Sequence, residues 1–127
     1  MAHRVLLVDD SAATRAFAAA ALEEVGGWEV EVAGGGAEAL ALLQRGAFDV
    51  VVTDVNMPDI NGLELIRFVR GHERHAALPV LVISTEGRDR DVDRAMALGA
   101  TDYLAKPFSP EQLVAAVRAL LGDRTGE

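Results

Sequence analysis

The chain has 127 residues, of which half are hydrophobic and none is cysteine, and its formal net charge is −8 at pH 7. This size and composition fit one domain with a full hydrophobic core, and the lack of cysteine excludes disulfides, thiolate metal sites and cysteine nucleophiles. The acidic balance argues against direct nucleic-acid binding, and the sequence has neither a membrane-length apolar stretch nor a signal peptide, so we expect a cytoplasmic protein with no membrane contact.

Five short segments of β-type residues alternate with longer segments of helical period, a pattern typical of a parallel sheet with helices on both faces. The predicted strands are residues 4–8, 29–33, 49–53, 79–84 and 101–105. The first, third and fourth are largely apolar, as expected of central strands, whereas the second alternates and the fifth is mixed, as expected of edges. This predicts a doubly wound, flavodoxin-like α/β fold with strand order 2-1-3-4-5.

Local signals agree with this layout at the last predicted helix. Ser109 can cap its N-terminus, Gln112 completes a capping box, and Gly122 supplies the stop. Only a short polar tail follows, and the sequence contains no linker or internal repeat. We therefore expect a single domain over residues 1–127, with a core of about residues 4–121 and no output domain.

Three acids follow two of the predicted central strands. Asp9 and Asp10 come directly after the first strand, and Asp54 comes directly after the third. In the predicted order these strands are neighbours, so the three carboxylates meet at one edge of the sheet. Like charges so close oppose each other's ionisation unless a cation binds between them, and oxygen-only ligands favour a hard divalent ion. The sequence therefore predicts a Mg²⁺ site.

Two further polar residues are predicted to reach the same edge. Ser84 ends the fourth predicted strand and Lys106 follows the fifth. A hydroxyl and an ammonium can bind a phosphoryl group, and an aspartate such as Asp54 can accept one as an acyl phosphate. Each residue alone also has a purely structural interpretation, as a strand end or a solvated lysine. The combination favours phosphoryl transfer to Asp54.

With these residues in place, the chain resembles the CheY-like receiver domain of bacterial two-component response regulators. The resemblance extends from about residue 4 to residue 121. The matching segments are Val8-Asp9-Asp10-Ser11, Thr53-Asp54-Val55-Asn56-Met57-Pro58, Gly62, Ser84-Thr85-Glu86, Gly99-Ala100, Tyr103 and Lys106-Pro107-Phe108. The resemblance implies that Asp54 accepts a phosphoryl group from a sensor histidine kinase or phosphotransfer protein. It also implies that the chain is no enzyme beyond its own phosphorylation and dephosphorylation.

The resemblance further implies roles for the other acids at the site. Asp10 and Asp54 would bind Mg²⁺ directly, Asp9 would bind it through water, and the Asn56 carbonyl would be a further ligand. Glu86 and Asn56 would tune hydrolysis of the acyl phosphate. Their pairing is similar to that of the chemotaxis regulator CheY, which indicates fast turnover.

The resemblance also implies a conformational switch. Ser84, together with Lys106, would bind the phosphoryl group, although the adjacent Thr85 offers a second hydroxyl for this role. Tyr103 matches the aromatic residue that turns inward when the hydroxyl moves toward phosphate, and it can equally be an edge-strand aromatic that packs on a helix. The Lys106–Pro107 bond is expected to be cis.

These inferences favour a stand-alone receiver that controls a partner protein through the fourth helix, the fifth strand and the fifth helix, in chemotaxis or motility. Other possibilities are a fragment of a larger regulator, a phosphorelay intermediate, or a receiver fold that has lost phosphorylation. A haloacid-dehalogenase-type phosphatase would need Asp-x-Asp spacing, which Asp9 and Asp10 lack. An FMN-binding module would need a phosphate loop rich in Ser and Thr after the first strand.

The remaining polar groups are interpreted as surface residues. The three histidines, His3, His72 and His75, show no metal-ligand spacing. The arginine-rich stretches at residues 67–70 and 88–90 are interleaved with acids or apolar residues, and we predict that both are solvated helix faces.

Overall fold

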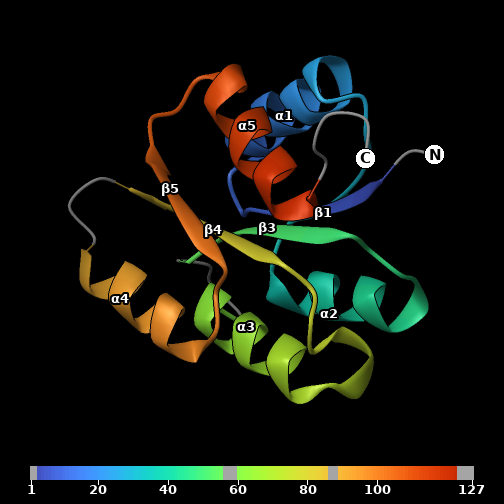
Figure 1. Ribbon diagram of the computed structural model, residues 1–127, viewed down its shortest axis with the longest axis vertical. Helices are drawn as coiled ribbons and strands as arrows, with labels where there is room; N and C mark the ends of the chain where they lie inside the picture. Colours follow the sequence, from blue (N-terminus) through green and yellow to red (C-terminus); the bar gives the residue numbers. More distant parts are fainter. Residues whose placement is uncertain (1–2, 56–59, 86–88, 123–127) are drawn as a thin grey trace.

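Five parallel strands form one sheet in the order β2-β1-β3-β4-β5, which confirms the predicted topology (Figure 1). The computed structural model describes residues 3–55, 60–85 and 89–122. The strands are β1 (Arg4–Val8), β2 (Glu29–Ala33), β3 (Val50–Asp54), β4 (Val80–Thr85) and β5 (Asp102–Lys106). The predicted edge strands are at the edges, because their alternating or mixed sequences cannot fill two apolar layers.

The helices cover both faces of this sheet. They are α1 (Ala12–Ala20), continued by the π-helical turn η1 (Ala21–Val25), α2 (Gly36–Arg45), α3 (Gly62–Gly71), the 3-10 turn η2 (Glu73–His75), α4 (Asp89–Leu98) and α5 (Pro110–Leu121). Figure 1 shows α1 and α5 on one face and α2, α3 and α4 on the other. Within the described ranges, no helix has both the length and the apolar character needed to cross a membrane.

The core consists of two apolar clusters, one on each face of the sheet. Alternate residues of the central strands enter different clusters, because successive strand side chains point to opposite faces. Leu7 and Val52 pack with α1 and α5, whereas Leu6 and Val51 pack with α2 and α3. All four residues are fully buried. The strands are therefore held rigidly, and their carboxyl ends are placed side by side.

The predicted signals for the last helix are confirmed. Ser109 accepts a hydrogen bond from the backbone N–H of Gln112, the Gln112 side chain accepts one from the Ser109 N–H, and Gly122 ends α5 in the left-handed conformation. The Lys106–Pro107 bond is cis, as expected.

Three predicted strands are displaced by one residue. β3, β4 and β5 each begin and end one position later than predicted. The reason is that pairing continues to the polar residues, since Asp54 is in register with Ile83 and Lys106 with Thr85. Asp54 and Lys106 are therefore the last residues of their strands, and the ladder fixes their backbone positions.

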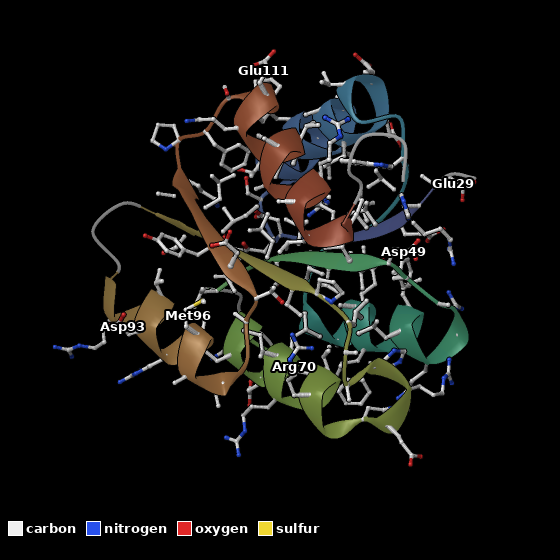
Figure 2. The ribbon with its side chains drawn as sticks, viewed as in Figure 1. Glu29, Asp49, Arg70, Asp93, Met96 and Glu111 are labelled. Atoms are coloured by element: carbon white, nitrogen blue, oxygen red, sulfur yellow. The ribbon has the colours of Figure 1, made fainter. Side chains whose placement is uncertain are left out.

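Two surface predictions are wrong. Arg70 is half-buried between α3 and the sheet (Figure 2), where its guanidinium donates to the carbonyl oxygens of Gly99 at 2.9 Å and Leu78 at 2.6 Å. Burial there lowers the pKa of Arg70 below its ordinary value. His75 is only 6% exposed and belongs to η2, packed under α3. Both side chains replace water by contacts with segments distant in sequence.

Candidate functional site: an acidic pocket at the carboxyl edge of the sheet

The side chains of Asp9, Asp54 and Lys106 lie on the same face of the sheet. Each comes two positions after an apolar residue that packs in or against the cluster under α1 and α5, and strand side chains two positions apart share a face. These apolar residues are Leu7, Val52 and Leu104. The strand order places β1 next to β3. The fold therefore brings together the two acids and the lysine that the sequence predicted to meet.

One ammonium group bridges two carboxylates in this pocket. Lys106 Nζ lies 3.1 Å from Asp54 Oδ2 and 3.4 Å from Asp9 Oδ2. The Asp9 side chain is 1% exposed, that of Asp54 13%, and that of Lys106 22%. Charge-assisted hydrogen bonds are stronger where water is partly excluded. The hydrogen bond from Lys106 therefore holds the Asp54 carboxylate in a fixed position at the mouth of the pocket.

Burial and the neighbouring charges shift two pKa values in the pocket. Burial raises the pKa of Asp9 above its ordinary value, and the Asp54 charge raises it further, against the lowering effects of the Ser11 N–H and Lys106. Burial acts to lower the pKa of Lys106, but the hydrogen bond and charge of Asp54, together with the charge of Asp9, raise it overall. The acids of the pocket thus favour a bound cation.

A third acid completes a set of oxygen ligands. Asp9, Asp10 and Asp54 each offer a carboxylate oxygen, and these oxygens all lie within 4.8 Å of one another. Asp9 and Asp54 are buried, whereas Asp10 is exposed and leaves the pocket open on one side. A cluster made only of carboxylates suits a hard cation such as Mg²⁺, which keeps several water ligands. The donor set fits the predicted metal.

Local chain signals hold the acids in place. The N–H of Ser11, the N-cap of α1, donates to Asp9 Oδ1 at 2.8 Å, and the Ser11 hydroxyl accepts from the N–H of Thr14. On the other side, Gly62 at the start of α3 donates its N–H to the Val55 carbonyl at 2.8 Å. A Cβ atom at Gly62 would collide with the Asp54 carbonyl oxygen. Glycine is therefore required where α3 passes beneath Asp54.

Ser84 and Tyr103 lie on the opposite face of the sheet from Lys106. Tyr103 is in register with Val82, and Ala105 with Ser84, so Ser84 shares the face of Tyr103 that is covered by α4. Ser84 is 4% exposed, whereas Tyr103 is 49% exposed and lies outward on the edge strand. The end of β4 therefore lies next to Asp54 of β3 and carries Ser84 on the face that α4 covers. Asn56 and Glu86 lie outside the described residues.

An apolar groove adjoins the pocket at Lys106. It has a volume of about 560 Å³ and is lined by Ala13, Thr14, Phe17, Lys106, Pro107 and Phe108. Phe17 is 45% exposed, and its ring centroid lies 6.0 Å from that of Phe108. A molecule that approaches Asp54 past Lys106 would contact this groove.

Sequence reasoning missed Arg15 of α1. Its Nη1 donates to the backbone carbonyl oxygen of Asp9 at 2.6 Å. Arg15 follows Asp10 by five positions and lies near the N-terminus of α1, where the helix dipole opposes a cation. This unfavourable placement is the signal that could have identified it.

Comparison with known proteins identifies the class to which this fold and pocket belong. Residues 5–118 match the response regulator receiver domain family. The chain therefore belongs to the response regulator receiver family.

Two proteins similar in sequence and one solved structure match most of this chain. The chemotaxis protein CheY homolog of Campylobacter jejuni is 36% identical over 125 residues, covering 98% of this chain and 96% of that protein. The structure of the chemotaxis response regulator CheY4 of Vibrio cholerae superimposes with a TM-score of 0.88 at 38% identity, covering 94% of this chain and 99% of that one. The transcriptional regulatory protein TrcR of Mycobacterium tuberculosis is 46% identical over 120 residues, covering 93% of this chain and 45% of that protein.

Membership of the family gives the acidic cluster a general meaning. Receiver domains bind Mg²⁺ at an acidic pocket, and the Asp9, Asp10 and Asp54 cluster has the composition to hold such an ion. They also interact with histidine kinases and with downstream targets as parts of signalling proteins.

Proposed function

We propose that this chain is a receiver that accepts a phosphoryl group on Asp54 from a phosphohistidine donor, with Mg²⁺ held by Asp9, Asp10 and Asp54. The observation that supports this best is the contact of Lys106 Nζ with Asp54 Oδ2 at 3.1 Å inside a cluster of three acids. A lysine placed there neutralises charge on the acceptor and can later bind an oxygen of the transferred group.

The proposed transfer forms one bond and breaks one. A carboxylate oxygen of Asp54 attacks phosphorus, the P–N bond of the phosphohistidine breaks, and its electron pair remains on the imidazole nitrogen of the donor. Bound Mg²⁺ supplies neutralisation of phosphoryl oxygen charge. Lys106 then moves its hydrogen bond to a phosphoryl oxygen. Water later attacks phosphorus, so that inorganic phosphate leaves and the Asp54 carboxylate is restored. The chain catalyses only its own phosphorylation and dephosphorylation.

The remaining site residues have proposed roles in binding and turnover. Ser84 donates its hydroxyl to a phosphoryl oxygen, with Thr85 as the alternative. Asn56 supplies a carbonyl ligand to the metal, and Asn56 and Glu86 tune hydrolysis, as the family resemblance implies. Substitution of each of these residues in turn, followed by measurement of labelling by acetyl phosphate, tests the assignments.

The proposed output is binding of a downstream protein to the face formed by α4, β5 and α5. This surface runs around the β5 edge of the sheet, from α4 on one face to α5 on the other. Ser84 and Tyr103 lie on the α4 side of that edge, and Met96 of α4 is 40% exposed (Figure 2). A phosphoryl group that binds Ser84 in only one arrangement of this face shifts the population toward that arrangement. The upstream donor, a sensor histidine kinase or phosphotransfer protein, reaches Asp54 across the groove at Phe17. The chemotaxis relatives favour a target in motility.

The acceptor assignment is tested by intact-mass measurement after incubation with acetyl phosphate and Mg²⁺. Wild type is expected to gain one phosphoryl group in a base-labile linkage, whereas Asp54→Asn gains none. Asp93→Asn, an exposed acid of α4, is the matched control and labels like wild type. Stoichiometric labelling of Asp54→Asn, or no labelling of wild type at saturating Mg²⁺, contradicts the proposal.

The output assignment is tested with beryllofluoride, which mimics the phosphorylated aspartate. Amide chemical shifts of α4, β5 and α5 are expected to change in wild type and to stay constant in Asp54→Asn. Changes confined to the residues around Asp9 and Lys106 would contradict a switch at the α4 face.

A further inference from the structure

Arg15 is a half-buried cation beside the acidic pocket that has no role in the proposed phosphoryl transfer. It lies on α1, four positions after the N-cap residue Ser11, and its Nη1 donates to the Asp9 carbonyl oxygen at 2.6 Å. That carbonyl belongs to the peptide unit that joins Asp9 to Asp10. A hydrogen bond from a guanidinium therefore fixes the backbone between two of the three acids.

We propose that Arg15 is a positioning residue for the divalent metal: it orients the Asp9–Asp10 peptide so that both carboxylates converge on the cation. The inference rests on the proposed function, because it requires Mg²⁺ at Asp9, Asp10 and Asp54. Arg15 does not contact the metal or the phosphoryl group, and it acts only through the main chain.

The backbone N–H and the carboxylate of Asp9 are also hydrogen-bonded. The carbonyl is the one remaining polar group of this residue, and Arg15 binds it. Its N–H donates to the Ala33 carbonyl of β2 at 3.1 Å. Its carboxylate accepts from the Ser11 N–H at 2.8 Å and from Lys106 Nζ at 3.4 Å. Without Arg15, the peptide that follows Asp9 can rotate while Asp9 itself stays anchored. The carboxylate of the exposed Asp10, the next residue, would then no longer be oriented toward the other two acids.

The guanidinium also reaches the next turn of the same sheet edge. A Cβ atom built on Gly34, which follows β2, would lie 3.5 Å from Arg15 Nη1 and 3.6 Å from Glu38 Oε1. Gly34 donates its N–H to Glu38 Oε1 at 2.9 Å. The Arg15 guanidinium therefore lies close to the turn after β2 as well as to the turn after β1. The planar guanidinium is also pre-organised, so little side-chain entropy is lost when it donates to the carbonyl.

Positioning and simple electrostatics predict opposite effects on metal binding. A cation beside the acids repels Mg²⁺, so removal of its charge alone would tighten binding. If Arg15 positions the ligands, its removal weakens binding despite that gain. Loss of groups that orient metal ligands typically lowers metal affinity by about tenfold or more. The direction of the change in affinity therefore decides between the two.

The experiment is calorimetric titration of the unphosphorylated full chain with MgCl₂ at constant ionic strength. Arg15→Gln is expected to bind Mg²⁺ about tenfold more weakly than wild type. Arg15→Lys keeps the charge but has a single donor group, and its affinity is expected to lie between the two. Arg67→Gln removes the same charge from an exposed position of α3, and its affinity should stay within about twofold of wild type.

Two outcomes overturn the inference: Arg15→Gln binding Mg²⁺ as tightly as wild type, or more tightly. Urea unfolding in EDTA is measured alongside, because a merely structural role would lower the midpoint without a change in Mg²⁺ affinity. If Arg15→Gln does not fold, Arg15→Lys decides, and its binding Mg²⁺ as well as wild type overturns the inference. Failure of wild type to bind Mg²⁺ would instead contradict the proposed function itself.

Discussion

The ammonium of Lys106 lies between the carboxylates of Asp54 and Asp9, at 3.1 Å and 3.4 Å from one oxygen of each. Lys106 is therefore attracted by the same carboxylates that could bind a metal ion. A divalent ion bound to these acids would weaken the attraction between Lys106 and the two carboxylates, and it would leave the hydrogen bonds of the ammonium available to another anion. A cation bound to these acids would therefore change the ionisation of Lys106, and this change can be measured directly at the lysine.

The pKa of Lys106 should fall when Mg²⁺ binds. Its pKa is raised by the hydrogen bond to Asp54 and by the charges of Asp54 and Asp9, against the lowering effect of burial. Mg²⁺ neutralises those carboxylates, so the raised pKa returns toward or below its ordinary value. Lys106 is the chain's one lysine, so ¹³C-lysine labelling gives a single side-chain signal for an NMR titration. Asp9→Asn should also lower this pKa, whereas Asp93→Asn should not. A lysine pKa that responds to neither Mg²⁺ nor Asp9→Asn would contradict the bridging geometry.

Gly62→Ala should slow phosphorylation. The new Cβ would collide with the Asp54 carbonyl oxygen, so either α3 or β3 must shift. A misplacement of about 1 Å can cost about a hundredfold in rate where reacting groups must be aligned. We expect labelling by acetyl phosphate to slow at least tenfold, measured by intact mass against time. Gly71→Ala is the matched control on the same helix, since a Cβ there meets nothing within 4 Å. Equal labelling rates for wild type and Gly62→Ala would show that the close approach is unimportant.

Arg70 is expected to stabilise the fold by joining α3 to the starts of β4 and β5. It donates to the carbonyls of Leu78 and Gly99 and to Thr101 Oγ1. Hydrogen bonds from a charged group contribute about 1.5–3 kcal/mol each, and truncation leaves the acceptors unpaired. Arg70→Ala should therefore lower the free energy of unfolding by about 2–4 kcal/mol in urea. Arg67→Ala, exposed on the same helix, should change it by less than about 0.5 kcal/mol.

Gly99 should be coupled to Arg70. Its φ is +117°, and a Cβ there would lie 2.9 Å from Arg70 Cγ. Gly99→Ala should therefore cost about 1–3 kcal/mol in wild type. The cost should be smaller in the Arg70→Ala background, because the clash is gone and only backbone strain remains. A double-mutant cycle in urea measures this difference, and strictly additive effects would contradict the contact.

The strand order and the pocket could be predicted because both depend on local sequence. Burial on two faces requires apolar runs, and these runs are visible in β1, β3 and β4. Acids directly after such strands must then meet at one edge. The strand ends could not be predicted, because the register of Asp54 with Ile83 is set by another strand.

Arg70 and His75 were misplaced for a related reason. Arg70 donates to carbonyls as far as Gly99, 29 residues away, and His75 pairs with the backbone of Leu43, 32 residues away in sequence. Nothing in their local sequence distinguishes them from solvated residues. Only the packing of distant segments decides which arginine or histidine of a helix end is buried.

Protonation of His75 should destabilise the fold as the pH falls. Burial lowers the pKa of His75, as do the charges of His72 and Arg74, while the hydrogen bond to Leu43 partly offsets this. Within the part of the chain that the structure describes, His75 Nε2 is buried with no hydrogen-bond partner, so a proton there has no acceptor. The unfolded chain binds that proton at an ordinary histidine pKa of about 6.5. The contribution of neutral His75 to the free energy of unfolding is therefore fully present above this pH. Below it, that contribution is lost by at most about 1.4 kcal/mol per pH unit.

The test is urea unfolding of wild type and His75→Asn between pH 7.5 and pH 5.5. Asparagine retains a donor near the Nδ1 position, so the bond to Leu43 can persist while the titrating group is removed. The slope of stability against pH should flatten in His75→Asn. An unchanged slope in His75→Asn would mean that His75 accepts its proton in the folded state without cost, which the buried, unpartnered Nε2 does not allow.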